Sequence, residues 1–420
     1  MKREDDPMTN ESLTLALLSA LVLMAILILM TAPPAAAQTE TLLYAFTGGT
    51  DGGQPFAHLA SDGAGNFYGT TAVGGLGYGT VFEVSPNGNG GWNETVLHAF
   101  TDGADGGYPL ASPVIFDSHG NIYGTTAKGG ANGFGVFFEL SPAGKSWNET
   151  VLYNFASGVG GVYPFNGLIM DSAGNFYGTD NVYQSGHAIT EGVFELSQSG
   201  GSWTEKVIYD NEVAVANFGG GGLTMDSAGN IFGISSGGFL PQIVFELSPN
   251  GHGVWKSTVL HSFAKRYYAE GAPVLDKSGN LYGTTASGGA SNNGTVYKLS
   301  PGKNGKWTED VVYAFKGGTQ DGSAPNAGIV FDAAGNIYGT TAGGGPSNDG
   351  TVFELVAPGG KGNHQYREKV LWSFNGADGS QPFGSLILDS AGNIYGVAPF
   401  GDNRGCTNDT GCGVVFEVTP

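Results

Sequence analysis

The chain has 420 residues, of which 74 are glycine, and a formal net charge of −20. This acidic balance argues against nucleic acid as a partner, because phosphate binding needs a basic face. Aromatic residues make up 12% of the chain, and no long segment has amphipathic helical periodicity, so we expect an all-β fold.

Residues 1–37 have the features of a targeting segment. The stretch 13–30 is nearly all apolar, and 35–37 is an A-x-A ending typical of signal-peptide cleavage. The apolar run is also long enough to span a bilayer, so a retained signal anchor is the alternative, and only then would the protein contact a membrane. Both interpretations place residues 38–420 outside the cytoplasm, secreted or exposed on the cell envelope.

Beyond this segment, one motif occurs seven times. It consists of Asp-x-x-Gly-Asn followed by a hydrophobic residue, then Tyr or Phe, then Gly. Successive copies are 50 to 57 residues apart. A period of this size indicates supersecondary units that are stacked or arranged in a circle. The repeated asparagines are Asn66, Asn121, Asn175, Asn230, Asn280, Asn336 and Asn393.

Each unit predicts four short strands. In the second unit, Asp117 begins a turn in which the aspartate bonds the following backbone and Gly or Asn takes positive φ. β-Branched and aromatic residues dominate the flanking segments, which favours strands. The strands expected here are 111–116, 121–126, 135–141 and 149–155. Four antiparallel strands in each unit describe a propeller blade.

The two ends of the repeat region complement each other. The chain finishes at 413–420 with a third strand that has no fourth after it, while 40–46 resembles a fourth strand without a blade of its own. We therefore predict that 38–420 forms a seven-bladed β-propeller of four-stranded antiparallel blades. The N-terminal strand should pair with the last blade, which removes two free sheet edges.

The repeat also carries a family resemblance. Besides the Asp-x-x-Gly-Asn hairpin, the units contain Gly-Thr-Val-Phe-Glu-Leu-Ser-Pro and Trp-x-Glu-x-Val-Leu-Tyr-x-Phe. Over residues 40–420 they resemble those of the choice-of-anchor tandem-repeat GloVer-containing proteins. The resemblance implies an exported bacterial repeat protein and supplies no catalytic residues. The hairpin is also similar to that of NHL-type propellers, which is an analogy of fold only.

The only two cysteines are Cys406 and Cys412 in the last unit, with five residues between them. In an oxidising compartment, this spacing predicts one local disulfide that closes a loop. A zinc site would need more ligands than the neighbouring sequence offers.

Residues that occur in one unit only are the best candidates for a functional site, because a residue that recurs in every blade is explained by its role in packing or in a turn. In the third unit, the irregular segment 180–191 brings His187 near Glu191, which suggests either a ligand-binding pair or ordinary loop residues. The fifth unit carries the only basic and aromatic cluster in this acidic chain. It could hold an anionic or sugar ligand, or be a solvated loop. This cluster is Lys265, Arg266, Tyr267 and Tyr268.

Calcium is the one cofactor that the sequence suggests. Asp102 and Asp105 lie in an Asp-Gly loop before a proline, where carboxylates alternate with backbone carbonyls. Ordinary turn chemistry is the competing interpretation, because the loop does not match the EF-hand spacing.

No nucleophile elbow, phosphate-binding loop, zinc motif or dinucleotide fingerprint occurs. We therefore predict an exported binding module, acting as a monomer on an unknown extracellular ligand, either a glycan or a protein. The alternative is a propeller enzyme, a hydrolase or lyase acting on sugars or lactones at the channel mouth, whose catalytic residues the sequence does not identify.

Overall fold

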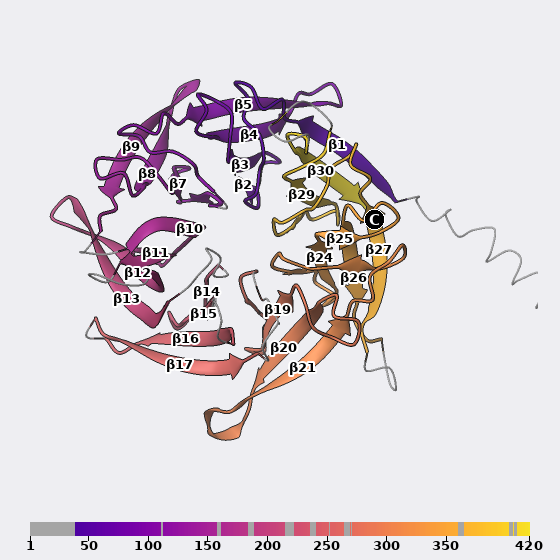
Figure 1. The fold of residues 1–420 in the computed structure, drawn as a ribbon. Coiled ribbons are helices and arrows are strands. Elements are labelled where there is room, and N and C mark those ends of the chain that lie inside the picture. Colours follow the sequence, from indigo (N-terminus) through magenta and orange to yellow (C-terminus); the bar gives the residue numbers. More distant parts are fainter. Residues whose placement is uncertain are drawn as a thin grey trace, which may run out of the picture.

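Seven four-stranded antiparallel sheets stand around a common axis, and each sheet is one blade of a β-propeller (Figure 1). Figure 1 is drawn from a computed structural model. The fold class predicted from the repeat is confirmed. The structure describes residues 38–110, 112–157, 161–183, 189–214, 222–235, 241–251, 253–263, 269, 271–359, 365–402, 406 and 410–420. The predicted targeting segment 1–37 lies outside these residues.

Within each blade the strands follow one another from the central axis to the rim. Blade 1 contains β2 (Ala60–Ser61), β3 (Phe67–Thr71), β4 (Thr80–Pro86) and β5 (Trp92–Ala99). Blade 2 contains β6 (Ile115–Phe116), β7 (Ile122–Thr125), β8 (Val136–Ala143) and β9 (Ser146–Asn154). Blade 3 contains β10 (Gly161–Met170), β11 (Phe176–Tyr183), β12 (Ile189–Ser199) and β13 (Ser202–Ala214). Blade 4 contains β14 (Thr224–Met225), β15 (Ile231–Ser235), β16 (Ile243–Pro249) and β17 (Trp255–Ser262).

The remaining blades repeat this order. Blade 5 contains β18 (Val274–Leu275), β19 (Leu281–Thr285), β20 (Thr295–Pro301) and β21 (Trp307–Ala314). Blade 6 contains β23 (Val330–Phe331), β24 (Ile337–Thr341), β26 (Thr351–Val356) and β27 (Arg367–Ser373). Blade 7 contains β28 (Ile387–Leu388), β29 (Ile394–Ala398), β30 (Val414–Thr419) and β1 (Thr39–Ala45). Outside the blades are the pair β22 (Gly322–Ser323) and β25 (Gly343–Gly344), and the 3-10 turn η1 (Lys303–Gly305).

The repeated Asp-x-x-Gly-Asn motif is the hairpin between the two inner strands. In blade 2, the Asp117 carboxylate accepts hydrogen bonds from the backbone of His119 (2.8 Å) and from the backbone and side chain of Asn121 (2.9 and 2.8 Å). The hydroxyl of Tyr123 donates to Asp117 (3.3 Å) and to Glu139 (2.9 Å) on the third strand. The motif is therefore a self-contained turn, as expected from its recurrence.

The glycine after the repeated tyrosine makes room for an aromatic ring. A Cβ added to Gly124 would lie 2.7 Å from the ring of Phe138 on the neighbouring strand, which is closer than carbon atoms can approach. The same clash would occur at Gly69 with Phe82. Because the ring is fully buried, glycine at this position is a condition for core packing.

Blade 5 has Tyr297 where six blades have phenylalanine, and its buried hydroxyl has no hydrogen-bond partner. We expect Tyr297→Phe to raise the free energy of unfolding by about 1 kcal/mol, because it removes an unsatisfied polar group and keeps the ring. Chemical denaturation would measure the change. Tyr123→Phe is the matched control: its hydroxyl is bonded, so it should lower stability, and equal effects of the two variants would contradict the explanation.

The hydrophobic core lies between the blades. One cluster combines Tyr68, Val81 and Phe100, which directly follows the outer strand of blade 1, with Ile122 and Val136 of blade 2. The tryptophan that begins the outer strand also packs across these junctions. Trp255 meets Tyr177 of blade 3 with ring centroids 5.7 Å apart, and Trp203 meets Phe137 of blade 2 at 5.2 Å. Adjacent blades therefore bury each other, which explains the recurring aromatic residue.

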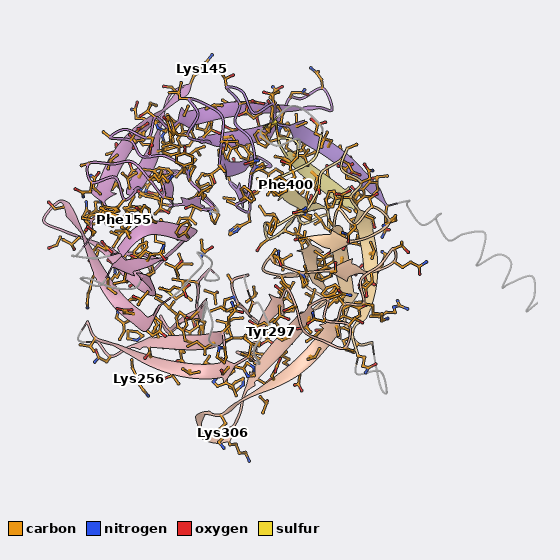
Figure 2. The ribbon with its side chains drawn as sticks, in the orientation of Figure 1. Lys145, Phe155, Lys256, Tyr297, Lys306 and Phe400 are labelled. Carbon is orange, nitrogen blue, oxygen red and sulfur yellow. A yellow bond between two sulfur atoms is a disulfide. The ribbon has the colours of Figure 1, made fainter. Side chains whose placement is uncertain are left out.

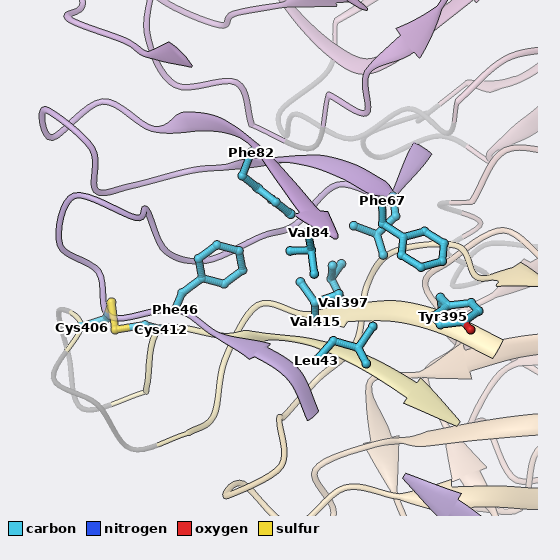
Figure 3. Close-up of a cluster of buried hydrophobic side chains, with 11 residues drawn as sticks. Leu43, Phe46, Phe67, Phe82, Val84, Tyr395, Val397, Cys406, Cys412 and Val415 are labelled. Carbon is cyan, nitrogen blue, oxygen red and sulfur yellow. A yellow bond between two sulfur atoms is a disulfide. The ribbon is translucent and has the colours of Figure 1, made fainter. Parts of the chain in front are cut away.

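The ring is closed by the N-terminal strand, as predicted. β1 pairs antiparallel with β30 from Thr39↔Thr419 to Ala45↔Val414, with a bulge at Leu43. Leu43 and the fully buried Phe46 turn into the core between blades 7 and 1 (Figure 3).

A disulfide joins Cys406 to Cys412 beside this closure, which confirms the predicted bond (Figure 3). The carbonyl oxygen of Cys412 accepts a hydrogen bond from the Gln54 backbone (2.7 Å), so the disulfide loop also contacts blade 1. Within the described part of the chain, no helix is long and apolar enough to cross a membrane.

Candidate functional site

Two sets of connections share one face of the propeller, which we call the loop face. One set joins each outer strand to the next blade, and the other joins the second and third strands of a blade. Backbone bridges link the two sets at Gly53↔Val73, Gly107↔Lys128 and Ser380↔Phe400. Loops carry most binding residues of rigid scaffolds, so this face is where a ligand site is expected.

A repeated backbone hydrogen bond fixes these loops across neighbouring blades. The donor is a residue with positive φ, which precedes a proline in each case, and the acceptor is a carbonyl oxygen of the preceding blade. This hydrogen bond involves only main-chain atoms, so it does not determine which side chain occupies the position. The bonds run from Gln54 to Cys412 (2.7 Å), Tyr108 to Tyr78 (2.7 Å), Tyr163 to Phe134 (3.0 Å), Ala324 to Asn293 (2.8 Å) and Gln381 to Asp349 (2.7 Å).

Among the junctions that the structure describes, aromatic side chains occupy these positions between blades 1 and 2 and between blades 2 and 3. Tyr78 and Tyr108 meet edge to face at 5.6 Å, and Phe134 and Tyr163 do the same at 5.6 Å. At the junctions of blades 5, 6 and 7 the equivalent side chains are Asn293, Ala324, Asp349 and Gln381.

The arc continues across the closure between blades 7 and 1. Phe56 packs against Phe400 at 5.6 Å and against Phe383 at 6.2 Å. Figure 2 shows Phe400 on the inner side of the blades, whereas Lys145 and Lys256 lie at the outer rim. We name the following half-buried residues the aromatic arc: Phe383, Phe400, Phe56, Tyr78, Tyr108, Phe134 and Tyr163.

Small residues form a collar around the axis, and His58 is the exception. The collar position lies eight residues before each repeated asparagine. It is two residues before the innermost strand in six blades and within β10 in blade 3. Neighbours there approach closely: a Cβ on Gly328 would lie 2.7 Å from the Ser385 hydroxyl oxygen, and one on Gly384 would lie 3.1 Å from the His58 Cα. The seven collar residues are His58, Pro113, Gly167, Gly222, Ala272, Gly328 and Ser385.

The imidazole of His58 is exposed to solvent but surrounded by protein. Desolvation lowers its pKa from 6.5 to about 4, so the ring is neutral at pH 7. A neutral imidazole offers one hydrogen-bond donor and one acceptor. Sequence inspection missed His58, although an alignment of the seven units places a titratable side chain at this position only in the first.

Most of the predicted site residues fall outside the described residues. His187 and the four residues of the basic and aromatic cluster of the fifth unit, Lys265, Arg266, Tyr267 and Tyr268, are among them. Their roles stay predictions.

Glu191 is described, and it is not a loop residue. It lies in β12, is only 9% exposed, and pairs with Asn181 of β11. The segment that begins at Asp180 was expected to be an irregular loop, but β11 and β12 extend into it because it has β-branched and aromatic residues where other units have glycine. The extension buries Asp180, whose role the sequence did not reveal.

The calcium candidates, Asp102 and Asp105, form a turn. The carboxylate of Asp105 accepts bonds from the backbone and hydroxyl of Thr101 and lies 3.2 Å from His98 Nε2. Asp102 is exposed, with φ of 56°. Among the residues that the structure describes, no three His, Cys, Asp or Glu side chains are grouped to hold a metal ion. Calcium binding at this loop stays a prediction.

Comparison with known proteins agrees with the fold. A family model described as the Gloeobacter/Verrucomicrobia repeat matches residues 28–148, 77–273 and 221–420. A search of curated proteins gave no match. Among solved structures, an extracellular domain of a two-component system from B. thetaiotaomicron is similar with a TM-score of 0.55 at 12% identity, covering 91% of this chain and 42% of that one.

Two enzymes are also similar to this chain. An ulvan lyase of polysaccharide lyase family PL25 has a TM-score of 0.49 at 10% identity, covering 90% of this chain and 95% of that one. An oxidoreductase from Thermus thermophilus, described as a glucose dehydrogenase, has a TM-score of 0.45 at 15% identity, with coverage of 73% and 95%. At such identities the similarity concerns the fold alone.

Proposed function

Because this chain belongs to the Gloeobacter/Verrucomicrobia repeat family, we propose that it is an exported binding module whose aromatic arc and collar hold a carbohydrate. The Cys406–Cys412 disulfide supports a location outside the cytoplasm, since such bonds persist in oxidising compartments.

The backbone conformation of two tyrosines supports the proposal most strongly. Tyr108 and Tyr163 have φ of 55° and 54°, a region that is costly for a bulky side chain. Glycine or asparagine would make the same backbone hydrogen bond with less strain. The rings pack edge to face against Tyr78 and Phe134 of the preceding blade, and half-exposed rings on a loop face are also typical of ligand contacts.

The composition of the site favours a neutral sugar. Aromatic faces pack against the apolar faces of sugar rings, and the neutral His58 and the Ser385 hydroxyl can exchange hydrogen bonds with sugar hydroxyls. The net charge of −20 repels polyanions, which argues against an acidic polysaccharide.

We expect Tyr108→Asn and Tyr163→Asn to weaken binding of a neutral oligosaccharide at least tenfold each, because each removes a stacking surface. Stability should change by less than about 1 kcal/mol, since the relief of backbone strain offsets the lost packing. A glycan array followed by calorimetry on the best ligand would measure both effects on the wild type and the variants.

Gln54→Asn and Gln381→Asn are the matched controls, because these residues hold the same backbone position without an aromatic ring. They should leave affinity unchanged. The proposal fails if no neutral glycan binds, or if the control variants lose as much affinity as the tyrosine variants.

The alternative, a hydrolase or lyase, is supported at the channel mouth by His58 alone. Among the described residues, the carboxyl groups with raised pKa values lie on the strands and loops of the blades, and none belongs to the collar. Turnover of a bound oligosaccharide in the same calorimetric experiment, followed by its reducing ends, would favour the enzyme.

A further inference from the structure

Acidic side chains meet at the junctions between neighbouring blades. In the regular junctions, an aspartate of the connecting loop faces a glutamate on the outer strand of the following blade. Asp51 is one such aspartate, and its charge acts on Glu94. The carboxylate of Asp51 is well bonded, because the Tyr44 hydroxyl (3.0 Å) and the Thr47 backbone (2.7 Å) donate to it. The other pairs are Asp105 with Glu149, Asp321 with Glu368, and Asp378 with Glu40.

The junction between blades 2 and 3 is built differently. Its connecting loop has Gly160 where the regular loops have aspartate. A carboxylate comes instead from Asp180, within β11, at a position where four of the six other blades have threonine and the other two have serine and alanine. The threonine at this position in blade 1, Thr71, bonds the hydroxyl of Thr80 at 2.8 Å, so the usual arrangement is uncharged. Asp180 replaces a neutral hydroxyl by a carboxyl group in the core of the junction.

The carboxyl groups of Asp180 and Glu205 meet over Gly161. A Cβ added to Gly161 would overlap the Asp180 carboxylate, and Glu205 Oε1 accepts a hydrogen bond from the Gly161 backbone (2.7 Å). A Cβ on Gly192 would lie 2.9 Å from Asp180 Oδ1 and 3.2 Å from the carbonyl oxygen of Tyr209. Two glycines therefore make room for a carboxylate that is only 2% exposed.

Three carboxylate oxygens at this point accept no hydrogen bond from a donor: Asp180 Oδ1, Asp180 Oδ2 and Glu205 Oε2. Burial raises the pKa of both groups, and the charge and hydrogen bond of Glu205, followed by the charges of Asp210 and Glu191, raise that of Asp180 further. Buried carboxylates need donors or a cation. One proton shared by Asp180 and Glu205 would still leave at least one of the three oxygens without a partner, whereas a cation would contact several of them.

We propose that Asp180 and Glu205 bind a calcium ion at the junction between blades 2 and 3, with backbone carbonyl oxygens and water supplying the remaining ligands. Oxygen is the ligand atom that calcium takes, in flexible geometry with six to eight ligands, whereas zinc selects nitrogen and sulfur and magnesium demands a regular octahedron. Two carboxylates balance the charge of a divalent ion.

The ion would link parts of the chain that the other junctions join by hydrogen bonds of the loop aspartate. Asp180 lies on β11 and Glu205 on β13, and the hydroxyl of Tyr153 on β9 donates to Glu205. Both ligands lie in blade 3, so calcium at this point would connect two strands of that blade, and blade 2 would reach the site through the hydrogen bond of Tyr153 to Glu205.

The test uses the mature protein, residues 38–420, stripped with EDTA and titrated with CaCl₂ at pH 7.5 by calorimetry and thermal denaturation. We expect one saturable site and a rise in Tm of several degrees. Asp180→Asn and Glu205→Gln should weaken binding at least tenfold and abolish the rise. Glu149→Gln alters a regular junction and should leave calcium binding unchanged.

Asp180→Thr is included in case the other variants fail to fold, because threonine is the residue at this position in four of the six other blades. It should melt cooperatively and show no response to calcium. Absence of saturable binding by the folded wild type, or undiminished binding by Asp180→Thr, would overturn the proposal and leave a proton-sharing pair. An equal response to MgCl₂ would overturn the assignment to calcium.

Discussion

A chain that begins at Thr47 instead of Gln38 is expected not to reach the folded ring. It lacks β1, so β30 has a free edge, and the core between blades 7 and 1 loses Leu43 and Phe46. Loss of Phe46 alone should cost about 3–5 kcal/mol, which is comparable to the whole stability of many domains. Near-ultraviolet circular dichroism and size-exclusion chromatography would show loss of fixed aromatic packing and formation of aggregates.

Two neighbouring leucines provide the control for this prediction. Leu43 is buried at the bulge, whereas Leu42 beside it is 38% exposed. Leu43→Ala should lower the free energy of unfolding by about 2–4 kcal/mol and Leu42→Ala by less than about 1 kcal/mol. A cooperative, native-like melt of the truncated chain, or equal costs for the two leucines, would contradict closure by β1.

Between pH 5 and pH 8, the free energy of unfolding is expected to fall. Burial, assisted by the charge of the facing loop aspartate, raises the pKa of four junction glutamates from 4.5 to about 7. The folded protein therefore keeps protons that the unfolded chain has released, so this stabilisation is complete below pH 4.5 and is lost as the pH rises through 7. The glutamates are Glu40, Glu94, Glu149 and Glu368.

Each of these side chains is half-buried, so solvent screening reduces the expected effect to roughly 1 kcal/mol per glutamate. Below pH 6.5, His58 has the opposite effect on the free energy of unfolding. Its pKa is lowered in the folded protein, so unfolding takes up a proton and the free energy of unfolding falls as the pH decreases. Differences between variant and wild type are therefore the useful measurement.

Glu94→Gln should match the wild type in urea denaturation at pH 5 and exceed its stability by roughly 1 kcal/mol at pH 8. The exposed Asp310→Asn should not change the slope with pH. A Glu94→Gln difference that does not depend on pH would show that the carboxyl group of Glu94 does not titrate in this range.

The regular features of the fold could be predicted from the sequence because each solves a local problem in every blade. The Asp117 turn makes its hydrogen bonds within seven residues. Gly124 is required because one aromatic ring on the neighbouring strand fills the space that a side chain would need. Closure of the ring could also be predicted, because the last unit lacks a fourth strand and residues 40–46 resemble a fourth strand without a unit of its own.

The candidate sites were harder to predict because their geometry crosses blades. At one aligned position, blade 3 has Asp180 where the other blades have an uncharged residue. That its carboxyl group meets Glu205 depends on how β11 and β13 are placed in three dimensions. The positive φ of Tyr108 is set by a carbonyl of the preceding blade and has no local signal. The useful clue in both cases is the aligned position at which one blade departs from the others.

The pairing of β1 with β30 also has a kinetic consequence. Along the chain, β1 precedes every other strand of the ring and its partner β30 follows them, so β1 stays unpaired, with its apolar residues unprotected, until β30 has been made. Contacts between such distant parts of a chain form slowly, because a long loop has to close first. The six complete blades can assemble in order, and the joining of β1 to β30 is then expected to set the rate at which the closed ring appears.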